Sequence, residues 1–104
     1  MEIYEISKSF PKEEAYSLTD QIRRSSRSVP SNVSEAWHKR RYKAAFISKL
    51  NDAEGEAGET QNWLFFAKSC KYITNEIAEK LHEDYNNIIG KLVIMIKNPD
   101  QWTI

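Results

Sequence analysis

A run of apolar and small residues, spaced alternately four and three positions apart, constrains the fold of this chain most strongly. The run lies within residues 43–69 and consists of Phe46, Leu50, Ala53, Ala57, Thr60, Leu64 and Ala67. This spacing places all seven side chains along one side of an α-helix, as in the seam of a coiled-coil-like bundle. Because the middle of the seam is alanine, a neighbouring helix can approach it closely. The sequence therefore predicts a long bundle helix over residues 42–69.

Three further segments carry helical patterns. Residues 74–97 begin at the potential N-cap Thr74 and end before Pro99, with a predicted seam of Ile77, Leu81, Asp84 or Tyr85, Ile88, Leu92 and Met95. Residues 11–38 keep one apolar side formed by Leu18, Ile22, Ser25 or Ser26, Val29, Val33 and Ala36 or Trp37. Pro30 predicts a kink in this helix, with a break into two helices as the alternative. Residues 2–9 suffice for a helix of about two turns.

The rest of the sequence favours helices alone. The chain of 104 residues contains three glycines and three prolines, and it has no alternating strand pattern and no Asn-Gly or Asp-Gly turn. The short connection at residues 71–73 predicts that the helices on either side run antiparallel. We therefore expect an all-α fold: an up-and-down four-helix bundle with a short first helix, forming one domain over residues 1–104.

Several classes of protein are disfavoured. The longest uninterrupted apolar run, Leu92–Ile96, is far shorter than the ~20 residues of a membrane-spanning helix. The single cysteine, Cys70, cannot form an internal disulfide, which favours a cytoplasmic protein. The two Glu-x-x-His pairs, Glu35/His38 and Glu79/His82, lie away from the predicted seams, so we expect no metal site. Without a nucleophile group or a glycine-rich phosphate loop, the sequence predicts neither an enzyme nor a cofactor.

Charge is divided sharply along a chain that is neutral as a whole. Residues 21–50 contain eight basic side chains and one acidic one, Glu35. Arginine donates bidentate hydrogen bonds to phosphate and stays charged, so such a block can bind a nucleic-acid backbone. The candidate nucleic-acid-binding residues are Arg23, Arg24, Arg27, His38, Lys39, Arg40, Arg41 and Lys43. The alternative is that these residues form an ordinary solvated surface.

A second candidate surface is apolar. Trp63 and Phe66 lie off the seam of their helix, and the segment around Val93 is apolar nearly all the way round. A monomeric bundle needs only one apolar side on each helix. We therefore expect a homo-oligomer interface that contains Trp63, Phe66, Val93 and Trp102.

One block of residues carries a family pattern: Phe10-Pro11, Glu13-Glu14, Tyr16, Leu18, Gln21-Ile22-Arg23-Arg24, Ser28-Val29-Pro30-Ser31-Asn32-Val33 and Glu35. The block resembles the bacterial four-helix-bundle family of 23S rRNA intervening-sequence proteins, and it is similar to accessory proteins of diversity-generating retroelements. Weaker matches continue through Phe46, Leu50, Glu56, Glu59, Leu64, Ala67, Tyr72 and Ile73. The resemblance implies a ring-like homopentamer whose basic surfaces bind nucleic acid in the retroelement relatives. In this family the helix before the Phe-Pro pair is usually longer than the nine residues present here.

The leading hypothesis is a non-enzymatic oligomeric bundle that binds RNA or DNA through the basic block with little sequence specificity. The first alternative is a protein-interaction module whose basic face and aromatic surface bind an acidic protein, a polymerase-like protein being one candidate. The second alternative is a helix-turn-helix over residues 12–43 with its turn at Pro30-Ser31-Asn32, which would need a dimer and base-reading side chains.

Overall fold

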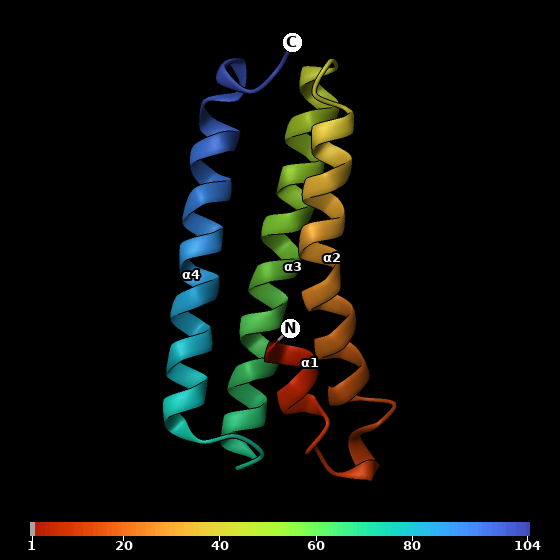
Figure 1. Cartoon of the computed structure of the whole chain (residues 1–104), viewed down its shortest axis with the longest axis vertical. Helices are drawn as coiled ribbons and strands as arrows, with labels where there is room; N and C mark the ends of the chain where they lie inside the picture. The colour runs from red at the N-terminus through yellow and green to blue at the C-terminus, as the bar shows by residue number, and fades with distance from the viewer. Residues whose placement is uncertain (1) are drawn as a thin grey trace.

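The computed structural model describes residues 2–104, which form an elongated helical bundle of 46 × 24 × 17 Å. Its α-helices are α1 (Glu2–Ser7), α2 (Leu18–His38), α3 (Lys43–Ser69) and α4 (Asn75–Lys97), with short 3₁₀ helices η1 (Lys12–Glu14) and η2 (Pro99–Gln101). Three long helices alternate in direction, and the short α1 lies beside their lower half (Figure 1). The predicted all-α four-helix bundle with a short first helix is confirmed.

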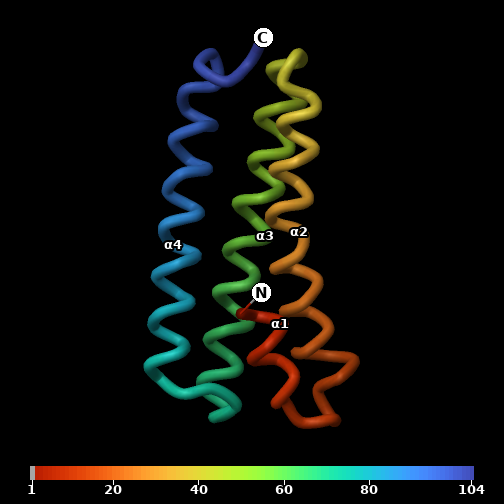
Figure 2. The backbone as a smooth tube through the Cα atoms, viewed as in Figure 1, coloured from red at the N-terminus to blue at the C-terminus, as the bar shows by residue number. Residues whose placement is uncertain are grey.

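Helix α3 is the centre of the bundle. All seven residues of its predicted seam are buried, none with more than 1% of its surface exposed. The helix packs against both α2 and α4, and the backbone trace shows it running between them (Figure 2). Small side chains at Ala53, Ala57 and Thr60 allow this close packing on two sides.

Helix α2 continues from Leu18 to His38 without interruption at Pro30, whose ring is exposed. The alternative of two separate helices is therefore wrong, and so is the helix-turn-helix with its turn at residues 30–32. The predicted start at residue 11 is also corrected. Residues 12–14 form η1, and the backbone of Ser17 (φ −127°, ψ −102°) lies outside the helical region, so α2 begins only at Leu18.

The buried side of α4 differs from the predicted seam. Ala78, Leu81, Tyr85 and Leu92 are buried, whereas Ile77 and Ile88 remain 38% and 36% exposed. Ile77 and Ile88 share the side of α4 that carries Lys80, which pairs with Glu2 of α1 at 2.9 Å. Because α1 has only six residues, it covers little of this side, and α4 instead turns its buried stripe towards α3.

Two hydroxyl groups meet inside the apolar core between α2 and α3. Ser25 and Thr60 are both fully buried, and their hydroxyl oxygens are 2.8 Å apart. Thr60 also bonds the carbonyl of Glu56 at 2.9 Å, whereas the other bond of Ser25, to the carbonyl of Ile22, is long at 3.4 Å. Each hydroxyl thus provides the other with a hydrogen-bond partner inside the core.

This pair predicts a coupled effect on stability. Thr60→Val should lower the free energy of unfolding by about 1–2 kcal/mol, because it leaves the Ser25 hydroxyl with only a weak partner in the core. The double variant Ser25→Ala/Thr60→Val should cost less than the sum of the two single variants, since no polar group is then left unpaired. Urea unfolding of the four proteins measures this, and strictly additive costs would contradict the account.

Candidate nucleic-acid interface

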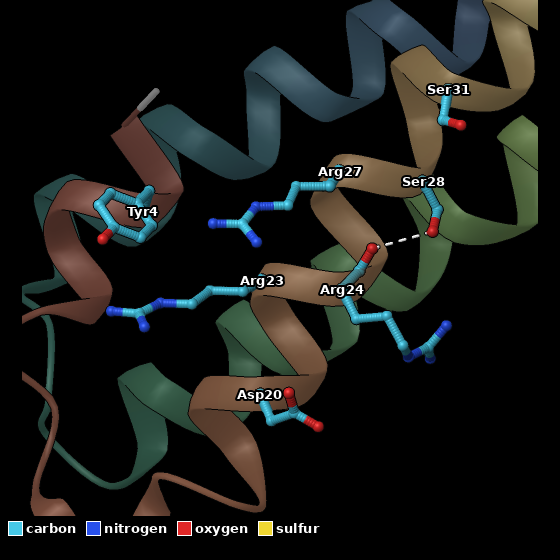
Figure 3. A pocket seen from close by; sticks show the side chains of 7 residues that line it. All are labelled: Tyr4, Asp20, Arg23, Arg24, Arg27, Ser28 and Ser31. Atoms are coloured by element: carbon cyan, nitrogen blue, oxygen red, sulfur yellow. Dashed lines mark hydrogen bonds between the residues drawn. The ribbon is translucent and has the colours of Figure 1, made fainter.

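The N-terminal part of α2 and helix α1 together form an open depression of about 630 Å³. The side chains that line it are Tyr4, Asp20, Arg23, Arg24, Arg27, Ser28 and Ser31 (Figure 3). All except Tyr4 come from successive turns of α2, because residues three and four apart share one side of a helix. The sequence periodicity therefore places Arg23 and Arg27 together, and α1 adds an aromatic side chain beside them.

The ring of Tyr4 organises the cations of this depression. The guanidinium carbons of Arg23 and Arg27 lie 4.6 and 5.5 Å from the ring centre, and the Lys8 ammonium lies 5.0 Å from it. Arg23 Nε also donates a 2.7 Å hydrogen bond to the buried hydroxyl of Ser7. Among residues 2–104, no carboxylate lies within 4.0 Å of Arg23 or Arg27. Their positive charge thus remains available to an anion.

Arg24 takes a different direction from its neighbours. It points away from Tyr4 (Figure 3) and lies 3.4 Å from both Glu56 and Glu59 of α3. Its guanidinium also donates to the side-chain oxygen of Gln21 at 3.1 Å. Arg24 was predicted to bind nucleic acid, but in this structure its charge is balanced by two carboxylates. The depression therefore owes its charge to Arg23 and Arg27.

The remaining basic candidates lie at the corner between α2 and α3. Lys39, at this corner, is about 18 Å from Arg27 along the axis of α2. Arg40 stacks on the Trp37 ring at 4.2 Å and donates to the Trp37 carbonyl. Lys43 pairs with Asp100 at 2.7 Å, whereas His38, Lys39 and Arg41 are exposed. The structure thus divides the predicted basic block into two groups, the α1–α2 depression and this corner.

Between the two groups, charge is largely neutralised. Glu35 pairs with Lys49 at 3.0 Å across α2 and α3. The Lys49 hydrogen bond and charge lower the pKa of Glu35, and the same contact raises the pKa of Lys49. The two Glu-x-x-His pairs lie on the surface: the side chains of His38, Glu79 and His82 are exposed, as is Glu35. Within the described residues, no three His, Cys, Asp or Glu side chains are grouped so that they could hold a metal ion.

The four candidate interface residues do not form one patch. Trp63 and Phe66, with ring centres 5.8 Å apart, lie near the start of α2, where they help to line a second pocket. Val93 and Trp102 lie towards the other end of the bundle, near the C-terminus of α4. Sequence reasoning also missed Tyr4, Ser7 and Lys8, because their role depends on how α1 packs against α2.

None of the helices within residues 2–104 combines the length and the apolarity that a membrane span requires.

The fold and this site define a small helical-bundle protein with a cationic depression beside α1. The family model described as 23S rRNA-intervening sequence protein matches residues 1–93, and the chain belongs to this family. The crystal structure of a protein of unknown function from the S23 ribosomal protein family of Bacteroides thetaiotaomicron VPI-5482 is similar, with 35% sequence identity and a TM-score of 0.83. The match covers 92% of this chain and 86% of that one. No curated protein matches the chain, and neither match mentions a retroelement accessory protein.

Proposed function

We propose that this protein is a non-enzymatic, homo-oligomeric bundle that binds the phosphate backbone of RNA or DNA with little sequence specificity. The observation that carries the proposal is the pair Arg23 and Arg27, which is held against Tyr4 without a carboxylate partner. A pair of arginines one helical turn apart, about 6 Å along the axis, suits neighbouring phosphates of one strand. Such contacts fix the position of the backbone and carry no sequence information.

Preorganisation strengthens the proposal. The hydrogen bond from Arg23 to Ser7 and the Tyr4 ring restrict the Arg23 side chain before any ligand arrives. Less side-chain freedom is then lost on binding, which lowers the entropic cost of the contact. Asp20, the one acid of the depression, points away from Tyr4 (Figure 3), and it forms no ion pair with Arg23 or Arg27.

The corner at Lys39 and Arg41 supplies a second and weaker contact. Both side chains are exposed, and neither has a carboxylate within 4.0 Å among the described residues. In an oligomer, the depression and the corner of each subunit would be repeated. Several weak phosphate contacts then act together through their high effective concentration.

The first test reverses the charge of the depression. Arg23→Glu/Arg27→Glu should weaken binding to a fluorescein-labelled 20-base-pair RNA hairpin by at least about tenfold. It should also reduce the slope of log affinity against log salt by about 2, since about one counterion is released for each phosphate contact. Fluorescence anisotropy between 50 and 300 mM salt measures both quantities.

The matched control is Lys68→Glu/Lys91→Glu. This variant makes the same change in net charge at two exposed lysines of α3 and α4, outside the depression and the corner. It should retain most of the affinity. Equal losses in the two double variants would show that only net charge matters and would contradict the proposed site.

The proposed self-association uses the exposed apolar surface at the C-terminal end of α4. Ile94 is 59% exposed there, and Trp102 of the following tail is also exposed. An apolar surface of this kind is typical of an interface between subunits. Val93 precedes Ile94 and is half-buried, and we include it in the proposed interface.

The proposed interface predicts the oligomeric state of the protein in solution. The wild-type chain of 12.2 kDa should elute as an oligomer in size-exclusion chromatography with light scattering. Ile94→Asp should shift it towards the monomer, whereas Ile77→Asp, at the other end of the same helix, should leave the oligomer intact. A monomeric wild-type protein at micromolar concentration would overturn this part of the proposal.

A further inference from the structure

The second pocket lies at the junction of η1, α2 and α3, and its lining residues suit a planar ring. It is an open pocket of about 470 Å³, a volume within the range typical of small-molecule sites. Its lining includes the aromatic rings of Tyr16, Trp63 and Phe66. Phe66 is 45% exposed and Tyr16 97% exposed, although both are large aromatic side chains. Little within the chain itself therefore covers them.

Few polar groups line the pocket, and their hydrogen bonds determine which of them is charged and which is unpaired. Glu14 accepts hydrogen bonds from the hydroxyls of Ser17 at 2.5 Å and Tyr72 at 2.9 Å. These bonds lower the pKa of Glu14, so its carboxylate is ionised at neutral pH and retains free lone pairs. The same contact with Glu14 raises the pKa of Tyr72 to about 12. The indole N–H of Trp63, by contrast, is buried without an acceptor.

The pocket and the cationic depression both border α2, and one hydrogen bond joins a side chain of each lining. Gln21 lines the pocket, Arg24 lines the depression, and the two side chains are bonded to each other at 3.1 Å. Gln21 and Arg23 are about 3 Å apart along the axis of α2, but they lie on nearly opposite sides of the helix because successive residues are about 100° apart. A strand whose phosphates lie on Arg23 and Arg27 therefore has to pass around α2, over the bonded Gln21 and Arg24 side chains, to place one base against Phe66.

We propose that this pocket binds an unpaired nucleobase, with a preference for guanine, from the strand held at the depression. Every base has a flat face that can stack on Phe66 and Tyr16. A carboxylate only accepts hydrogen bonds, and guanine presents two adjacent donors, N1–H and the N2 amino group, on its Watson–Crick edge. Glu14 can accept both of them. This inference rests on the proposed function and adds to it a site that reads one base.

The test uses Trp63 as a reporter and the neighbouring phenylalanine as a control. In a Trp37→Phe/Trp102→Phe background, Trp63 is the only tryptophan left in the chain. A ten-nucleotide oligouridine RNA with one central guanosine should quench its fluorescence at lower concentrations than all-uridine RNA does. Phe66→Ala should weaken binding of the guanosine RNA about tenfold, as is typical for loss of one stacked base. Phe65→Ala should have no such effect, because Phe65 is exposed on the same helix but does not line this pocket.

A second variant tests the guanine preference. Glu14→Gln should bring the ratio of the affinities for the two RNAs close to one, since only the carboxylate accepts from both guanine donors. An unchanged ratio in this variant would contradict the guanine preference.

The outcomes separate the two proposals. If both RNAs bind in a salt-dependent way but Phe66→Ala binds like the wild type, the base pocket is wrong and the phosphate site stands. If neither RNA binds, both proposals are wrong. If the Trp63 signal changes with protein concentration and not with RNA, a second copy of the chain occupies the pocket, and the base-binding inference is overturned.

Discussion

The structure depends on the packing of α3 against two helices at once. Its seam from Phe46 to Ala67 is buried along its whole length, and the small residues in its middle let α2 and α4 lie close on two sides. Because α2 uses its apolar side for this contact, its opposite side must carry the polar residues. The positions of Arg23 and Arg27 thus follow from the packing of α3, and the short α1 needs only to supply Tyr4 and Ser7.

Ion pairing decides which cations of this neutral chain can meet a ligand. Arg24, Lys43 and Lys49 each have a carboxylate partner from another part of the chain. Arg23 and Arg27 instead face an aromatic ring, which orients a cation without cancelling its charge. Exposed ion pairs contribute little to stability, so their main effect here is to remove some basic side chains from the candidate interface.

The sequence predicted what depends on local spacing and missed what depends on distant partners. The α3 seam and the number of helices follow from periodicity, and both are confirmed. The buried side of α4 was misplaced at Ile77 and Ile88, because it depends on how far α1 extends beside α4. The pairing of Arg24 with Glu56, 32 residues away, and the contact of Tyr4 with Arg23 leave no signal in local sequence. The stripe of basic residues was therefore predictable, whereas its division into paired and unpaired side chains was not.

The central claim is that a nucleic-acid strand lies against the α1–α2 depression. Photo-crosslinking of the protein to an RNA that contains 4-thiouridine, followed by mass spectrometry of the crosslinked peptides, tests this claim most directly. The account predicts crosslinks to Tyr4 and to residues 20–31, and fewer at the corner formed by residues 38–43. Crosslinks confined to α4, with none on α1 or the N-terminal half of α2, would contradict it.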